Sequence, residues 1–166
     1  MKTIEINVYK FDELDKQTKE KVINNNRYIN VEDTFWYDWI QDDFNRLGLE
    51  IENFDISRGG YVNIYISNLE DTSKNIIKEF GDSVHIKQTA KSYIDEYNKI
   101  QANFKNDEDI EREVEILDDQ YIKRYSDNIL SYLRDEYDYQ ISDEAIIETI
   151  EANDYNFTWN GEIFRL

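Results

Sequence analysis

The sequence predicts an α+β protein with a small antiparallel sheet, an aromatic core helix, an antiparallel pair of long helices, and a C-terminal helix followed by a β-hairpin. Apolar residues alternate with polar ones in several short stretches, which is the two-residue period of a half-buried strand. Elsewhere they recur every three or four residues, as on the buried face of a helix. The 166 residues are 40% hydrophobic and 14% aromatic, which is enough to build a core.

The first elements are a strand and a helix. Ile4, Ile6 and Val8 alternate with polar neighbours and predict a strand. Asp15 is placed to cap a helix over residues 16–28, because an aspartate oxygen can accept the free N–H groups of the first helical turn.

An aromatic helix is predicted over residues 31–48, ending at Gly48, where glycine adopts a left-handed cap at little cost. Its apolar residues fall on one side at helical spacing. They are Trp36, Trp39, Ile40, Phe44 and Leu47. We expect this face to organise the core around the flanking strands.

A hairpin is expected next, with strands over residues 49–56 and 61–67. Its turn, residues 57–60, contains the paired glycines Gly59 and Gly60, which tolerate positive φ. On the second strand Val62, Ile64 and Ile66 face one way.

Residues 68–133 follow the helical period almost throughout. A short helix capped by Asn68 or Asp71 is predicted to end at Gly81. Two long helices follow, separated by a polar link at residues 105–107, and a link this short makes them antiparallel neighbours.

The C-terminal segment begins with the clearest capping signal in the chain. Ser142 is the expected N-cap of a helix that ends near Asn153. A hairpin about Asn160-Gly161, the favoured pair for a type I′ turn, then places Phe157 opposite Phe164, Tyr155 opposite Leu166 and Trp159 opposite Glu162. The organisation predicted is one domain over residues 1–166: a β-α-α-β-β core (1–67), a helical insertion (68–140), and a helix plus hairpin that returns to the core (141–166).

The charge balance limits the classes of partner that the protein can bind. With 37 acidic and 19 basic residues, the net charge of −18 repels nucleic acid and anionic membranes and favours encounter with basic proteins. Residues 107–119 and 132–154 each hold eight acids and a single arginine. These blocks either pair internally, face a partner, or serve solubility alone.

No residue pattern specific to catalysis or cofactor binding is present, so we expect no enzyme activity, metal or cofactor. The chain lacks cysteine and has one histidine, His85, outside any nucleophile context. Asp38 and Asp42, four residues apart on the aromatic helix, are the nearest approach to a Mg²⁺ pair, and a solvated face explains them better.

Two stretches resemble small acidic proteins encoded by phages and mobile elements, some of which are labelled antitoxin-like. One is FDELDKQTKEKVI with the following W-x-x-W-x-x-DDF-x-x-LG helix and hairpin, and the other is SDEAIIETIEANDYNFTWNGEIF. Together they cover about half of the chain. Their caps, core aromatics and hairpin concern folding, so the resemblance assigns no functional residue, and it leaves the helical residues 68–133 as the expected seat of function.

These features favour a phage-derived inhibitor that blocks a host defence nuclease, of the anti-CRISPR or anti-restriction kind. Carboxylates at helical spacing can imitate nucleic-acid phosphates and occupy a channel lined by lysine and arginine. The expected partner-binding residues are Asp107, Glu108, Asp109, Glu111, Glu115, Asp118 and Asp119, with Tyr121 and Tyr125 as aromatic anchors.

Two alternatives remain open. The first is an antitoxin-like protein that neutralises a basic toxin, and the second is a metal-dependent hydrolase built from scattered carboxylates. The N-terminus lacks the apolar run of a signal peptide, so the expected location is the bacterial cytoplasm, without membrane or direct nucleic-acid contact. Self-association through the tyrosine-rich helices is a further expectation.

Overall fold

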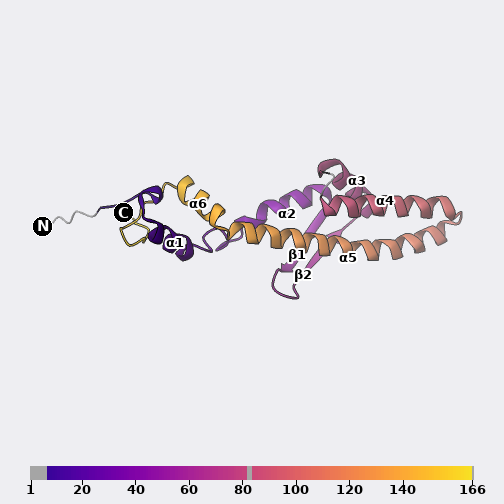
Figure 1. Cartoon of the computed structure of the whole chain (residues 1–166). Helices are drawn as coiled ribbons and strands as arrows, with labels where there is room; N and C mark the ends of the chain where they lie inside the picture. Colours follow the sequence, from indigo (N-terminus) through magenta and orange to yellow (C-terminus); the bar gives the residue numbers. More distant parts are fainter. Residues whose placement is uncertain (1–6, 82–83, 166) are drawn as a thin grey trace. The chain divides into compact units, whose positions relative to one another are not determined.

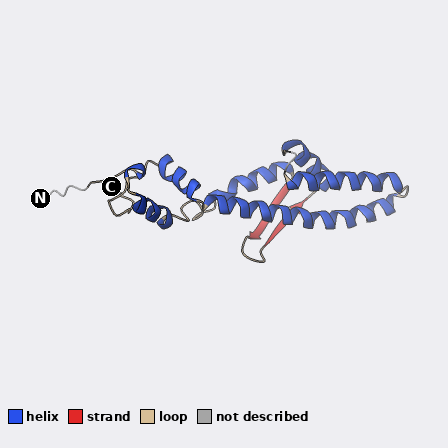
Figure 2. Ribbon diagram, viewed as in Figure 1, coloured by secondary structure: helices blue, strands red, loops and turns tan. Residues whose placement is uncertain are grey.

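A computed structural model describes residues 7–81 and 84–165. These residues form mainly helices together with one two-stranded antiparallel sheet, which confirms the α+β class (Figure 2). The elements in order are the 3₁₀ turn η1 (Phe11–Glu13), α1 (Lys16–Asn25), α2 (Phe35–Leu47), β1 (Leu49–Asp55), β2 (Tyr61–Ile66), α3 (Leu69–Glu79), α4 (His85–Asn103), α5 (Asp107–Gln140) and α6 (Asp143–Ala152).

The chain divides into two compact units. Unit one comprises residues 1–36 and 135–166, and unit two comprises residues 37–134. This grouping differs from the predicted one, because most of the aromatic helix and the hairpin that follows it cluster with the long helices instead of with the chain's first elements.

The core of unit one joins both ends of the chain. It consists of Phe11, Leu14, Val22, Ile23, Ile146, Ile150 and Phe157. Tyr9 and Phe157 exchange backbone hydrogen bonds of 2.8 Å in each direction, so the N-terminal segment pairs with the C-terminal one. Of the predicted first strand, Ile4 and Ile6 lie outside the described residues, and Tyr9 contributes an isolated bridge.

The helices of unit one begin where their capping residues predict. The Asp15 carboxylate accepts a hydrogen bond from the Thr18 N–H at 2.9 Å, and the Ser142 hydroxyl accepts one from the Ala145 N–H at 3.2 Å. The first helix ends at Asn25, three residues earlier than predicted. The chain continues in turns after this point. At the end of the helix, the side-chain amide of Asn26 donates a hydrogen bond to the Val22 carbonyl oxygen at 2.8 Å.

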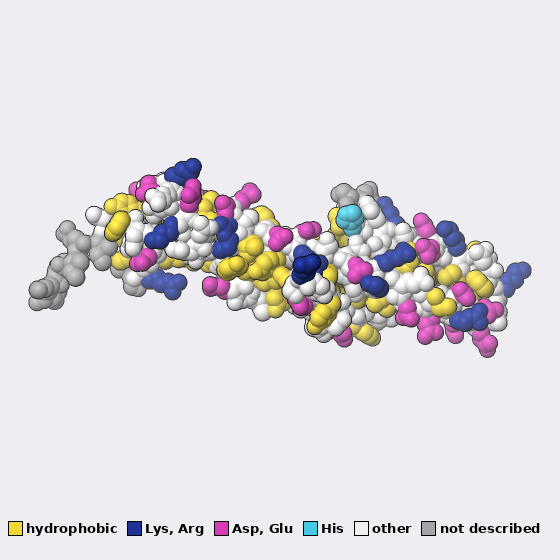
Figure 3. Space-filling model, turned by 60° about the horizontal axis from the view of Figure 1, so that its bottom comes forward, with side chains coloured by type: hydrophobic (Ala, Val, Ile, Leu, Met, Phe, Trp, Pro, Cys, Tyr) yellow, Lys and Arg dark blue, Asp and Glu magenta, His cyan; other side chains and the backbone are white. Residues whose placement is uncertain are grey.

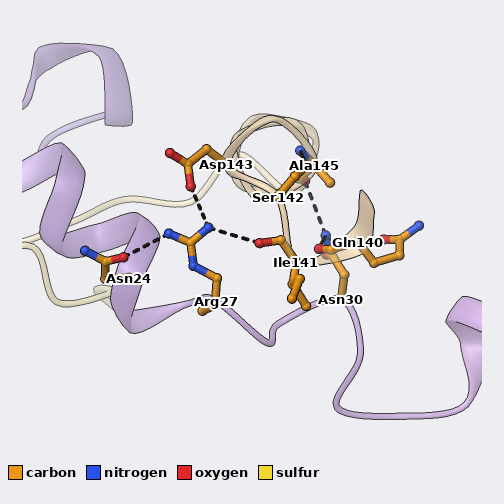
Figure 4. Close-up of polar contacts among 8 residues, drawn as sticks. All are labelled: Asn24, Arg27, Asn30, Gln140, Ile141, Ser142, Asp143 and Ala145. Atoms are coloured by element: carbon orange, nitrogen blue, oxygen red, sulfur yellow. Dashed lines mark hydrogen bonds and ion pairs between the residues drawn. The ribbon is translucent and has the colours of Figure 1, made fainter. Parts of the chain in front are cut away.

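Two polar side chains after α1 hold the junction between α5 and α6 (Figure 4). The Arg27 guanidinium donates to Asn24, to the Ile141 carbonyl at 3.0 Å and to the Asp143 carboxylate. Asn30 donates to the carbonyl oxygens of Gln140 at 3.1 Å and Ala145 at 3.3 Å. Each contact spans more than 100 residues of sequence, except the local one to Asn24.

The C-terminal turn differs from the predicted type I′ turn. Phe157 pairs with Ile163, one residue away from the predicted partner Phe164, and Thr158 pairs with Glu162 through a 2.9 Å hydrogen bond. The loop therefore has three residues, with Gly161 at φ +84° and Trp159 78% exposed. A type I′ turn would also require positive φ at Asn160, which does not have it. Gly161 packs against α1, where a Cβ would lie 3.0 Å from the Val22 side chain, so a larger residue here would crowd the helix. The predicted pairing of Trp159 with Glu162 is therefore wrong as well, and Leu166 lies outside the described residues.

Unit two is built on the apolar face of the aromatic helix α2. Ile40, Phe44 and Leu47 are at most 5% exposed, as predicted. Trp39 is 43% exposed, and its indole meets the Tyr132 ring edge-on at a centroid distance of 6.4 Å. The side of α2 that carries Trp39 is therefore at the margin of this core.

The hairpin β1–β2 has the predicted strands and turn. Its register runs from Leu49 opposite Ile66 to Asp55 opposite Tyr61, with an irregularity between Ile51 and Asn53. Only glycine fits at position 60, because a Cβ there would lie 1.8 Å from the Asp55 carbonyl oxygen. The turn is fastened to α5 by Arg134, which donates to the carbonyl oxygens of residues 56 and 57 at 3.0 and 2.6 Å.

Helices α4 and α5 lie side by side and run antiparallel, as predicted (Figure 1). Hydrogen bonds connect them in reverse order along the two helices. The Tyr93 hydroxyl donates to Asp118 at 2.7 Å, and Asn128 donates to Thr89 at 2.9 Å.

Candidate functional site

Helix α5 carries two stripes of opposite character, an exposed one near its start and a buried one that begins at Leu117. The inner stripe repeats every four residues and is at most 5% exposed. It consists of Leu117, Tyr121, Tyr125, Ile129 and Leu133. The outer stripe also repeats every four residues, and its members are exposed acids: Asp107, Glu111, Glu115 and Asp119. We call these four residues the acidic ridge.

The ridge carboxylates make no side-chain hydrogen bond or ion pair with any residue that the structure describes. The basic residue closest in sequence, Arg112, pairs instead with Asp109 at 3.2 Å and with Glu113 at 3.5 Å. Successive ridge residues are about 6 Å apart along the helix axis. Like charges at this spacing destabilise a helix by roughly 0.2–0.5 kcal/mol a pair, or about 1 kcal/mol for the three pairs. The ridge is thus a row of negative charges that no residue of the described ranges neutralises.

At the right-hand end of Figure 3, acidic side chains line the lower edge of the view, with Lys and Arg side chains among and above them. Glu108 is exposed beside the ridge, and its N–H donates to the Asn106 side chain at 3.3 Å at the start of α5. Five predicted acids therefore share one exposed region: Asp107, Glu108, Glu111, Glu115 and Asp119.

The other two predicted acids have internal roles. Asp109 is half-buried and pairs with Arg112 within the same helix. Asp118 is half-buried and accepts the hydroxyl hydrogen bond of Tyr93 at 2.7 Å. Burial raises the pKa of the Asp118 carboxyl, although the Tyr93 hydrogen bond acts in the opposite direction.

Tyr121 and Tyr125, which were predicted as aromatic anchors for a partner, are core residues in this structure. Both are 0% exposed. The Tyr121 hydroxyl donates to Glu96 at 2.8 Å and its ring meets that of Tyr93 edge-on, while Tyr125 shares a 2.8 Å hydrogen bond with Ser73. Burial raises the pKa of both phenols, so they stay protonated and hydrogen-bonded. The sequence contains a signal for this burial, because both tyrosines follow the four-residue period that connects Leu117 to Ile129 on one face of the helix.

A groove of about 390 Å³, which no sequence pattern predicted, lies between the start of β2 and the middle of α5. It is lined by Gly60, Tyr61 and Val62 from the hairpin, and by Asp119, Ile122, Lys123, Ser126, Asp127 and Leu130 from α5. Asp119 is both the last residue of the acidic ridge and the first α5 residue of this groove. The ridge therefore leads directly into a partly apolar hollow.

The possible metal and catalytic residues do not assemble. No group of three or more histidine or acidic residues within the described ranges 7–81 and 84–165 is arranged to hold a metal ion. Asp42 and His85 are exposed, His85 being the first residue of α4, whereas Asp38 is half-buried on α2.

Comparison with protein-family models, with curated proteins and with solved structures finds no match to this chain. Among the described residues, none of the helices combines the length and the apolar character needed to span a bilayer.

Proposed function

We propose that this chain is a non-enzymatic inhibitor that binds the basic, nucleic-acid-binding surface of a partner protein through the acidic ridge. The observation that carries the proposal is the row of four exposed carboxylates on one helix, which pair with none of the residues that the structure describes. From the resemblance that the sequence of the two ends suggests to proteins of phages and mobile elements, we infer that the partner is a host defence nuclease in the bacterial cytoplasm.

The physical basis is charge complementarity. Lysine and arginine residues that line a nucleic-acid channel are spaced to meet phosphates, and a rigid helix presents carboxylates to them at regular intervals of about 6 Å. The ridge lies on a single α-helix that packs against the rest of unit two further along, so its backbone loses little conformational entropy on binding. The attraction should weaken as salt rises, because these charges are exposed to solvent.

The test uses the tagged full-length chain to capture proteins from a bacterial host lysate at low and moderate salt. A captured nuclease is then assayed for cleavage with and without the chain. We expect salt-sensitive capture and inhibition. A small basic toxin as the main captured protein would favour the antitoxin-like alternative instead.

Two matched variants decide whether the ridge is responsible. The ridge variant carries Asp107→Asn, Glu111→Gln, Glu115→Gln and Asp119→Asn. The control variant carries Asp42→Asn, Glu52→Gln, Asp135→Asn and Glu151→Gln, which are exposed acids elsewhere on the chain. Each set changes the formal net charge from −18 to −14. Loss of inhibition in the ridge variant alone supports the proposal, whereas equal inhibition by both variants would contradict it.

A further inference from the structure

The groove beside the ridge has the features of a site for an extended peptide segment. Its α5 residues fall at intervals of three and four, from Asp119 to Leu130, and so form one continuous stripe along the helix. This stripe rises about 16 Å along the helix axis, which matches five residues of extended chain. Val62 is buried, and Ile122 and Leu130 are half-buried, so the middle of the groove is apolar.

We propose that this groove binds an extended segment of the partner in which two arginines flank an apolar residue, in the order Arg-x-apolar-x-Arg. This inference rests on the proposed function and specifies the partner's side of the same surface. Asp119 and Asp127 are eight residues apart on α5, a separation of about 12 Å along the axis.

The spacing of an extended chain matches this separation. Alternate side chains of a strand point to the same face, so residues one, three and five of a segment all face the groove. Residues one and five are about 13 Å apart, which brings their guanidinium groups to Asp119 and Asp127. Residue three then lies over the apolar middle, near Ile122.

The charges and walls of the groove suit arginine. Asp119 has no side-chain partner among residues 7–81 and 84–165. Asp127 pairs with Lys123 at 3.3 Å, but both side chains are more than 60% exposed, so this pair is weak and exchangeable. The Tyr61 ring, 51% exposed, supplies a face on which a guanidinium can stack. Arginine also lays its aliphatic stem on apolar surface while its head group binds carboxylate.

The experiment is an NMR titration of the ¹⁵N-labelled full-length chain with Ac-Arg-Ser-Leu-Ser-Arg-NH₂. Two matched peptides serve as controls: one has citrulline at both arginine positions, and the other, Ac-Arg-Arg-Leu-Ser-Ser-NH₂, has the same composition with the wrong spacing. We expect saturable shifts of the amide signals of Gly60, Val62 and Ser126. The citrulline peptide loses both exposed ion pairs and should bind roughly fivefold more weakly, whereas the misspaced peptide keeps the pair at residue one and should bind roughly twofold more weakly.

The double variant Asp119→Asn/Asp127→Asn should lose the preference for the correctly spaced peptide, whereas Asp42→Asn/Asp135→Asn should keep it. Equal binding of all three peptides, or shifts spread over other acidic surfaces, would overturn the inference. Such a result leaves the ridge proposal standing if the ridge variant still loses inhibition. Conversely, specific peptide binding without any inhibited partner would overturn the proposed function and leave the groove's preference established.

Discussion

Residues 107–119 and residues 132–154 hold eight acids each, but among the described residues only in the second stretch do acids pair with basic residues distant in sequence. In the second stretch, Asp143 binds Arg27 and Asp154 binds Lys10, so acids near the C-terminus hold segments from the beginning of the chain. In the first stretch, Asp109 and Glu113 share Arg112 of the same helix, and the ridge residues pair with no described residue.

This difference separates two uses of the same composition. Acids that pair with distant basic residues, as in unit one, help to hold segments together, and part of their negative charge is neutralised by these pairs. Acids that repel their neighbours along a helix add nothing to the stability of the isolated chain. Their negative field is therefore available to a partner, which is why we place function in unit two.

The largest expected effect is in the core that the C-terminal segment completes. Phe157→Ala should lower the free energy of unfolding by roughly 3–5 kcal/mol, because Phe157 is 0% exposed and its ring packs against Phe11. Urea denaturation measures this loss. Trp159→Ala, two residues away and 78% exposed, is the control and should change stability by less than about 0.5 kcal/mol. Similar losses in both variants would contradict the observed register of this hairpin.

A smaller loss is expected at the polar junction of unit one. Arg27→Ala removes three hydrogen-bonding contacts and leaves the Ile141 carbonyl without its donor, at a cost of roughly 1–3 kcal/mol. Arg27→Lys should recover only part of this, since an ammonium group cannot reproduce the fork of a guanidinium. Arg58→Ala, at the exposed hairpin turn, is the matched control for thermal unfolding. If Arg27→Ala is as stable as Arg58→Ala, the long-range pairing does not stabilise unit one.

Tyr121→Phe distinguishes a core tyrosine from a partner anchor. The variant loses the hydrogen bond to Glu96, and we expect a loss of about 1 kcal/mol in stability. Because the ring is fully buried, capture and inhibition of the partner should not change. A variant with normal stability and impaired inhibition would restore Tyr121 to the binding surface.

Neutralising the ridge should have little effect on folding. The four-residue ridge variant relieves repulsion, so its unfolding free energy should stay within about 1 kcal/mol of the original and rise most at low salt. Thermal melts at two salt concentrations measure this. A large loss of stability would mean that the ridge acids support the fold, and the comparison between the two acidic stretches would fail.

The smallest effect concerns the pH dependence at Asp118. Burial raises the pKa of this carboxyl above its ordinary value, so its contribution favours the folded state below that ordinary pKa and is lost as pH rises through the raised one. Asp118→Asn lacks this titration. Its stability relative to the original chain should therefore increase from acidic to neutral pH, as followed by urea denaturation across that range. A difference that is independent of pH, or that has the opposite sign, would contradict the burial of this carboxylate.

The sequence by itself determined the local elements. Ser142 and Asp15 mark helix starts because a capping bond involves residues only three positions apart. The hairpin turn follows from Gly59 and Gly60 for the same reason, and the three- and four-residue period of apolar side chains predicts α4 and α5 without knowledge of their surroundings.

Only the tertiary structure decided which side chains are available. The C-terminal loop has three residues and places Gly161 against α1, a contact between segments about 140 residues apart. Arg27 pairs with Asp143, whereas no described residue pairs with the ridge acids. A count of charges in the sequence could not reveal this difference. Tyr121 is buried because α4 covers it, and the groove exists because the hairpin lies beside α5. Burial and pairing depend on segments distant in sequence, so they are properties of the packed chain and not of any local pattern.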